Sequence, residues 1–120
     1  MKESDWRSQL IKQFREKKLG FIWANDVRYK AGYPDLYTIR KGVSIHYELK
    51  YHRGEFSELT ILDKTMTKLQ QAVCKSIAGA RGNVYTLVLL ENKSVYAYNW
   101  FNLRGQLYTP EQFYSWWISS

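Results

Sequence analysis

The sequence predicts a mixed α/β fold in which helices flank a central β-sheet, and three patterns support this prediction. Residues 43–50 (VSIHYELK) alternate between apolar and polar side chains, as expected for a strand with one buried face. Apolar residues recur at helical spacing over residues 4–19 and again over residues 67–80. A nearly continuous apolar run at residues 83–90 has the composition of a buried strand. Such elements in one short chain are expected to pack as layers around one core.

The first half of the chain is expected to supply one helix and three strands. The helix over residues 4–19 should end at Gly20, which can act as a C-terminal cap. Residues 21–24 are predicted to form a short strand. A further strand over residues 36–39 is joined through a Lys-Gly turn to the alternating strand over residues 43–50, so these two strands form a hairpin.

The second half is expected to supply two more strands and two helices. Residues 51–65 show no clear period and are predicted to form a loop. The helix over residues 67–80 leads to the strand over residues 83–90, which a turn connects to an edge strand over residues 95–100. A last helix should begin at Thr109-Pro110, where the threonine caps the helix and the proline fits its first position.

Length and composition limit the classes of protein to consider. The chain has 120 residues, enough for a single domain spanning residues 1–120. Lys and Arg number 18 against 11 Asp and Glu, so the formal net charge is +7 and polyanions are the expected partners. Cys74 is the only cysteine, which excludes an intramolecular disulfide and a cysteine-based zinc cluster. Because there is neither a membrane-length apolar run nor a signal segment, we expect a soluble, cytoplasmic protein with no membrane partner.

Two acidic residues and a lysine are predicted to meet in the hairpin. Side chains of a strand alternate between two faces, so Glu48 and Lys50 project together, away from the face of Tyr47 and Leu49. Asp35 lies at the start of the partner strand and can reach the same spot if the two strands pair. Two carboxylates beside an ammonium group can hold a hard divalent cation. The alternative is an exposed ion pair on a solvated strand face.

The order of these residues resembles the signature of the PD-(D/E)XK nuclease superfamily. Here the signature consists of Pro34-Asp35, twelve intervening residues and Glu48-Leu49-Lys50. Within that superfamily the chain is most similar to stand-alone virus-type replication-repair nuclease (VRR-NUC) domains. Three segments carry this likeness: Gly32-Tyr33-Pro34-Asp35-Leu36, Tyr47-Glu48-Leu49-Lys50 and the later Leu69-Gln70. The resemblance implies a restriction-endonuclease-like core.

The resemblance and the chemistry of the side chains together suggest a role for each residue. Asp35 and Glu48 are expected to bind Mg²⁺ or Mn²⁺, with the backbone carbonyl of Leu49 as a third oxygen ligand. Lys50 would orient or deprotonate the attacking water and offset charge on the scissile phosphate. In the family that the chain resembles, a glutamine at the place of Gln70 points toward the metal. Gln70 is therefore expected to position water or phosphate; the alternative is an ordinary polar residue at the edge of an apolar stripe.

The first helix departs from the family pattern. The superfamily usually places a glutamate that faces the metal on this helix, and the matching position here is Arg7. Glu3 lies one turn earlier on the same helical face and is the expected substitute, whereas Glu16 lies about 90° around the helix. The alternative is that Glu3 is a surface acid stabilised by the helix dipole.

Five basic residues are expected to contact DNA around the site. Arg28 and Lys30 precede the hairpin, and His52, Arg53 and Lys64 belong to the segment that follows it. Positive charges on either side of the carboxylates could grip the phosphates that flank the scissile bond. Ordinary surface charges on loops are the alternative.

Together these features predict a metal-dependent DNA endonuclease that hydrolyses phosphodiester bonds. Resemblance to stand-alone VRR-NUC domains implies a homodimer that acts on branched DNA such as Holliday junctions. Short nucleases of this type are common in phage genomes, and the location would then be the host cytoplasm. One alternative is a site-specific homing or restriction-type endonuclease, although 120 residues leave little room for a sequence-reading module. The other is a basic DNA-binding protein without catalysis.

Aromatic residues crowd the last quarter of the chain. We expect more rings there than a small core can bury, so that the surplus forms the contact surface of a symmetric dimer. The alternatives are packing within the monomer and stacking on single-stranded bases. The rings concerned are Trp100, Phe101, Tyr108, Phe113, Tyr114, Trp116 and Trp117.

Overall fold

The computed structural model describes residues 2–25 and 31–119 of the chain. The described part contains four helices and six strands. In chain order they are α1 (Glu3–Glu16), β1 (Phe21–Ala24), β2 (Leu36–Arg40), β3 (Val43–His52), α2 (Ile61–Thr65), α3 (Lys68–Gly79), β4 (Asn83–Leu90), β5 (Val95–Asn99), β6 (Arg104–Tyr108) and α4 (Pro110–Ser119).

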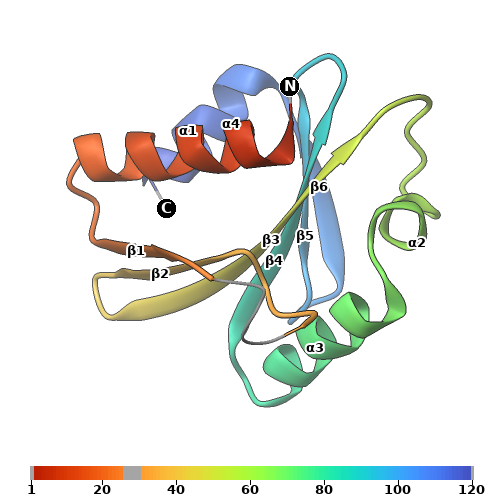
Figure 1. Ribbon diagram of the computed structural model, residues 1–120, viewed down its shortest axis with the longest axis horizontal. Helices are drawn as coiled ribbons and strands as arrows, with labels where there is room; N and C mark the ends of the chain where they lie inside the picture. Colours follow the sequence, from red (N-terminus) through yellow and green to blue (C-terminus); the bar gives the residue numbers. More distant parts are fainter. Residues whose placement is uncertain (1, 26–30, 120) are drawn as a thin grey trace.

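The six strands form one mixed sheet in the order β1-β2-β3-β4-β5-β6. In the described chain, β3 and β4 run parallel, and the other neighbouring strands run antiparallel. Parallel neighbours need a long crossover connection, and here that connection contains α2 and α3. Figure 1 shows α1 and α4 on one side of the sheet and α3 on the other.

The larger core lies between the sheet and the helices α1 and α4. Trp6, Leu10 and Phe14 fall at helical spacing on α1 and are buried. They pack together with Phe113 and Trp117 of α4. The central strands contribute alternate residues to this core: Tyr47, Leu49, Leu87 and Leu89.

The opposite face of the sheet is covered by the crossover. Cys74 of α3 is fully buried there with Met66 and Trp100. The hydroxyl of Thr86 accepts a hydrogen bond from the indole Nε1 of Trp100 at 2.8 Å. Glu48 pairs with Thr86 in the parallel register, so Glu48 lies on this covered face. The alternative of an exposed ion pair on a solvated strand face is therefore wrong for Glu48.

The predicted fold class, a mixed sheet flanked by helices, is confirmed. The predicted hairpin is also present as β2 and β3, which pair with antiparallel register. In the described ranges, no helix combines the length and the apolar character that crossing a membrane requires.

Several element boundaries differ from the prediction. α1 ends before Gly20, since Lys17 caps it. Residues 51–65 are not one loop, because β3 continues to His52 and α2 follows within the same stretch. β5 is not an edge strand, because β6 pairs with it along its length.

Five of the seven C-terminal rings are buried or half-buried within the monomer, so the expected surplus is much smaller than predicted. Three of them are almost completely buried: Trp100 (4% exposed), Phe113 (6%) and Trp117 (2%). The ring of Trp117 lies 5.1 Å from that of Tyr47 between centroids, and its Nε1 donates to the carbonyl of Leu10 at 3.1 Å. Aromatic pairs at such distances contribute to the packing of a core. Two rings of the group remain exposed: Phe101 and Tyr114.

Candidate active site

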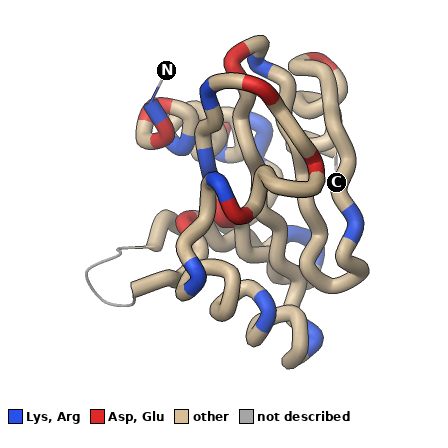
Figure 2. The backbone as a smooth tube through the Cα atoms, turned by 90° about the vertical axis from the view of Figure 1, so that its right-hand side faces the viewer, with Lys and Arg blue, Asp and Glu red and all other residues tan. Residues whose placement is uncertain are grey.

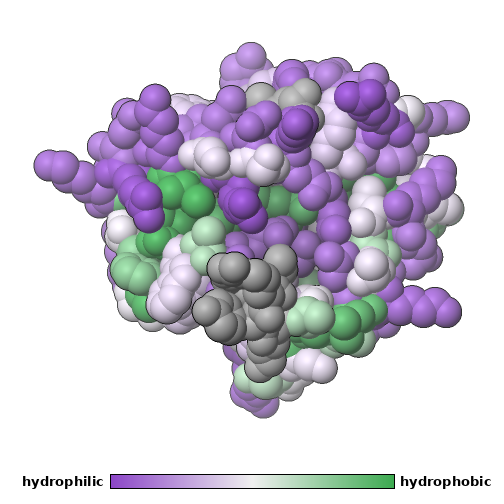
Figure 3. All heavy atoms as spheres, viewed as in Figure 1, coloured by the Kyte–Doolittle hydropathy of each residue, from purple (hydrophilic) through white to green (hydrophobic). Residues whose placement is uncertain are grey.

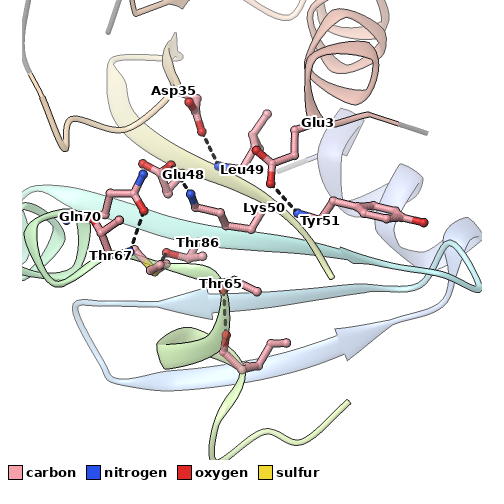
Figure 4. A network of polar contacts seen from close by, with 12 residues as sticks. Glu3, Asp35, Glu48, Leu49, Lys50, Tyr51, Thr65, Thr67, Gln70 and Thr86 are labelled. Atoms are coloured by element: carbon pink, nitrogen blue, oxygen red, sulfur yellow. Dashed lines mark hydrogen bonds and ion pairs between the residues drawn. The ribbon is translucent and has the colours of Figure 1, made fainter. Parts of the chain in front are cut away.

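Two carboxylates bind the edge of β3 that extends beyond β2. β2 is too short to pair with this part of β3. Oδ2 of Asp35 accepts a hydrogen bond from the backbone N–H of Leu49 at 2.8 Å. Oε1 of Glu3 accepts one from the backbone N–H of Tyr51 at 3.0 Å. Figure 4 shows both bonds, in which side chains take the place of a neighbouring strand.

The backbone carbonyl of Leu49 lies on the same edge of β3. The N–H and C=O of one residue in a strand point to the same side, and the N–H of Leu49 points to Asp35. Along the edge this carbonyl falls between the amides of Leu49 and Tyr51, which are ~6.8 Å apart. The proposed third oxygen ligand is thus placed between the positions where Asp35 and Glu3 bind the strand.

The two glutamates of α1 lie at opposite ends of the helix. Glu3 reaches β3 from the first residue of α1. Glu16 is the last residue of α1, and its exposed Oε1 lies 3.9 Å from Nζ of Lys12. A helix of this length separates its ends by ~20 Å. The structure therefore brings Glu3 to the candidate site and leaves Glu16 away from it.

Glu48 is the buried acid of the site, with only 1% of its surface exposed. Its Oε1 lies 3.8 Å from Nζ of Lys50, whose side chain is also largely buried. Its Oε2 is buried and has no hydrogen-bond partner within residues 2–25 and 31–119. Burial of an unpartnered carboxylate oxygen is unfavourable, and such a group often marks a place where an ion or water binds.

The surroundings of Glu48 raise its pKa to about 9. Burial is the main cause, because a weakly polarisable surrounding disfavours the charged form. The negative charge of Asp35 raises this pKa further, as does a hydrogen bond that only protonated Glu48 can make with Asp35, whereas Lys50 lowers it. Without a cation, these surroundings therefore favour the protonated form of Glu48. A bound cation would replace the proton.

α3 covers the site with Gln70 and Cys74. Oε1 of Gln70 accepts from the N–H of Thr67 at 3.0 Å, and Oγ1 of Thr67 accepts from the N–H of Gln70 at 3.0 Å, which completes a capping box. In Figure 4 the nitrogen end of the Gln70 amide points toward Glu48. Burial and the charge of Glu48 raise the pKa of the Cys74 thiol to about 12, so Cys74 stays protonated and is not a nucleophile.

The turn before Asp35 packs directly against α3. Gly32 has φ 78°, a left-handed conformation that glycine adopts at low cost. A Cβ at this position would lie only 2.7 Å from Cγ of Leu69 on α3. Only glycine lets the turn lie this close to the helix, and this packing helps to hold Asp35 in place.

Three of the five residues expected to contact DNA lie in the described ranges: His52, Arg53 and Lys64. Nε2 of His52 lies 3.0 Å from the carbonyl oxygen of Glu55. The guanidinium of Arg53 lies 5.8 Å from the centroid of the Tyr51 ring, and Lys64 is exposed on α2. α3 also carries two lysines, Lys68 and Lys75, and no acidic residue, and Figure 2 shows these basic positions along the helix. Two expected residues lie outside the described ranges: Arg28 and Lys30.

Sequence reasoning missed one residue that lies next to the carboxylates, Thr86. Thr86 is opposite Glu48 in the parallel register. Its position beside Glu48 depends on the pairing of β3 with β4, which no short sequence motif predicts. His46 precedes Glu48 by two residues, and its ring lies 4.7 Å from that of Tyr37 between centroids. The alternation of residues 43–50 predicts that His46 shares the face of Glu48, and the strand register agrees with this.

The oxygen groups around Glu48 fit a Mg²⁺ or Mn²⁺ ion. Asp35, Glu48 and the carbonyl of Leu49 are hard oxygen donors, and the partnerless Oε2 of Glu48 favours a nearby positive charge. Mg²⁺ is commonly bound by one or two carboxylates and keeps several waters. Over the described residues, no three Asp, Glu, His or Cys side chains lie close enough to enclose a metal by themselves. Water and substrate oxygens would therefore complete the coordination.

Known proteins provide no relative from which the role of the site could be inferred. No protein-family model matches the chain, and a search of curated proteins finds no similar sequence. The likeness to the nuclease signature therefore rests on two segments, Pro34-Asp35 and Glu48-Leu49-Lys50, and on their contacts.

Proposed function

We propose that the protein is a metal-dependent endonuclease that hydrolyses phosphodiester bonds in DNA. One observation carries the proposal: Glu48 is buried with one oxygen lacking a partner among the described residues, beside Asp35 and Lys50. A buried carboxylate in such surroundings lowers the stability of the fold, so a structural role alone does not explain its presence. Strongly perturbed carboxylates of this kind cluster at functional sites.

Each residue has a distinct role in the proposed reaction. Asp35, Glu48 and the carbonyl of Leu49 would hold the ion. When bound, Mg²⁺ supplies positive charge near the scissile phosphate and helps to activate water. Lys50 places its ammonium group beside Glu48, where it can hydrogen-bond the attacking water or a phosphate oxygen. The amide nitrogen of Gln70 is a donor for the same oxygens.

The substrate class is proposed to be branched DNA, as the resemblance to VRR-NUC domains implies. The net charge of +7 suits a polyanionic substrate. Paired cuts across a junction need two sites at a fixed distance, which a homodimer supplies. Because five of the seven C-terminal rings are buried or half-buried, the dimer would have to use those that remain exposed, Phe101 and Tyr114. Sedimentation velocity at micromolar concentration tests this part of the proposal.

The decisive experiment compares DNA structures with and without metal. The purified protein is incubated with four-way junction, flap, nicked, linear and single-stranded DNA, with Mg²⁺, Mn²⁺ or EDTA. We expect metal-dependent cleavage, fastest on branched DNA, and its loss in Glu48→Gln and Asp35→Asn. Glu16→Gln is the matched control, because it removes an exposed carboxylate distant from the site. Full activity of Glu48→Gln would refute the assignment of the site.

Two alternatives have clear outcomes in the same experiment. A non-catalytic DNA-binding protein is favoured by the absence of a three-residue metal cluster in the described chain. It would bind DNA and leave every substrate intact in both metals. A site-specific endonuclease would instead cut linear DNA at one sequence and show little preference for branches.

A further inference from the structure

Among residues 2–25 and 31–119, no helix covers β1 and β2 on the face of the sheet that carries Glu48 (Figure 1). α2 and α3 cover β4 and β5 on this face, whereas β1 and β2 lie beyond them (Figure 1). Three apolar side chains point outward there: Phe21 is 51% exposed, Trp23 59% and Ile39 38%. Figure 3 shows apolar residues at the surface in this region of the molecule. We call this surface, formed by Phe21, Trp23, Tyr37, Ile39 and His46, the aromatic face.

The rings of the aromatic face form a row that leads to the candidate active site. Trp23 of β1 is opposite Tyr37 of β2, and Tyr37 is opposite His46 of β3. Residues opposite each other in antiparallel strands share one face of the sheet. His46 and Glu48 are two positions apart on β3, a distance of ~6.8 Å along the strand. The row therefore spans three strands and ends next to the buried carboxylate.

The charges at one end of the aromatic face are positive, whereas the carboxylates Asp35 and Glu48 lie at its other end. Residues 17–25 and 36–47 contain no Asp or Glu and include Lys17, Lys18 and Lys41. Gly20 lies against the backbone of Ile39, which puts the lysines before β1 and the turn after β2 at the same end of the face. A chain bound between this end and Glu48 would have positive charge at one end and the proposed cleavage centre at the other.

We propose that the aromatic face binds a few unpaired nucleotides of a single-stranded DNA segment that continues into the cleavage site. This inference rests on the proposed function for the position of cleavage, but not for the binding itself. Flat rings stack on bases of any sequence, and flanking lysines attract the phosphates. Charge complementarity favours DNA over a second copy of this chain, since two copies would bring the same lysines together.

The test measures binding in EDTA, where no cleavage can occur. Fluorescence anisotropy compares a labelled single-stranded oligonucleotide with one of equal length whose central nucleotides are abasic. We expect the wild-type protein to bind the abasic strand about tenfold more weakly, because stacking on the missing bases is lost. This comparison needs no variant, so it remains informative whatever a substitution does to folding. Equal affinity for the two strands, or no binding of either, would overturn the proposal.

Variants assign the effect to the face. Trp23→Ala should weaken binding of the base-containing strand about tenfold and should leave affinity for the abasic strand unchanged. Trp23→Phe keeps a ring at this position and should restore most of the lost affinity. Leu107→Ala is the matched control, because Leu107 is exposed on the opposite edge strand, β6. Equal weakening for both oligonucleotides by Trp23→Ala would contradict base stacking. A change from dimer to monomer in Trp23→Ala with unaltered DNA affinity would show that the face joins two copies instead.

The two proposals can fail separately. Base-dependent binding without any cleavage in Mg²⁺ would remove the nuclease assignment and leave the aromatic face as a single-strand binding surface. Metal-dependent cleavage combined with equal affinity for abasic and base-containing strands would remove the aromatic face and leave the nuclease.

Discussion

The two faces of β3 differ in what their residues contribute. Tyr47 and Leu49 are buried in the core beneath α1 and α4, where rings pack against rings. Glu48 is equally buried on the other face but leaves one oxygen without a partner in the described chain. Alternate residues of β3 therefore have different roles: those on one face stabilise the core, and those on the other form the candidate site. Substitutions on the two faces should give opposite signatures, and the following predictions test that contrast.

The largest effect on folding is expected for Trp117→Ala on the core face. Trp117 is 2% exposed and contacts Tyr47 and Phe14 with ring centroids at 5.1 and 5.8 Å. Its removal should lower the free energy of unfolding by ~3–5 kcal/mol. Urea denaturation measures this loss, and Trp23→Ala, at an exposed ring, should change stability by less than about 1 kcal/mol. A stable Trp117→Ala protein would show that this core tolerates a large cavity.

Glu48→Gln should show the opposite pattern. Cleavage should fall by a hundredfold or more, because one electrostatic partner in an active site contributes ~2.7–4 kcal/mol to the transition state. Stability at pH 8 without metal should not fall, since an amide in this position carries no charge to desolvate. Single-turnover cleavage and urea denaturation of the same preparation give both numbers. Loss of stability together with loss of cleavage would mean that Glu48 is structural.

The pH dependence of stability should reveal the same group. The pKa of Glu48 is about 9 in the folded protein against 4.5 ordinarily, so between these values the folded state binds more protons than the unfolded state. The free energy of unfolding should therefore decrease as pH rises through this window, by up to ~1.4 kcal/mol per pH unit. Urea denaturation in EDTA at pH 6 and 8 measures the slope. Glu48→Gln should flatten it, and an unchanged slope would contradict the assignment.

A smaller effect is expected at the turn before Asp35, which packs against α3. Gly32→Ala should cost about 1 kcal/mol or more and should also reduce cleavage, because the new Cβ would meet Leu69 and displace the turn before Asp35. Gly42→Ala is the matched control: it has a similar φ of 79° but nothing within 4 Å of the added Cβ. Equal effects of both substitutions on cleavage would leave backbone strain, rather than the contact with α3, as the cause.

The smallest effect should separate the two glutamates of α1. Glu3→Gln should reduce cleavage by less than about tenfold, since the amide oxygen can still accept from Tyr51 and only the charge is lost. Glu16→Gln should leave cleavage unchanged. Identical rates for both variants and the wild type would show that the site works without a carboxylate from α1.

The local part of the candidate site could be predicted from the sequence, whereas its cover could not. The alternation of residues 43–50 and the preceding turn defined the hairpin, and with it the approach of Asp35 to Glu48. Alternation cannot tell whether the polar face of a strand meets water or a helix. Only the parallel pairing with β4 brings Thr86 and Cys74 over Glu48, and that pairing joins residues far apart in the chain.

The missed elements lacked the patterns on which sequence reasoning depends. β6 (RGQLY) has no alternation, and its Gly105 lies against the hydroxyl of Tyr96, a contact that only the folded sheet reveals. α2 has five residues, too few to show a helical period. The burial of Trp117 was missed because a count of rings does not say how much space lies between two helices and a sheet.

The parallel pairing of β3 with β4 also sets an order of events in folding. The hairpin of β2 and β3 closes a short stretch of chain, whereas pairing with β4 must close the whole connection over residues 53–82, which is slower. Asp35 and Glu48 are therefore expected to come together while water still surrounds them. Dehydration of Glu48 then belongs to the last stage, when the crossover docks. Local unfolding of the crossover alone could therefore expose Asp35 and Glu48 to water again, while the hairpin of β2 and β3 stays paired.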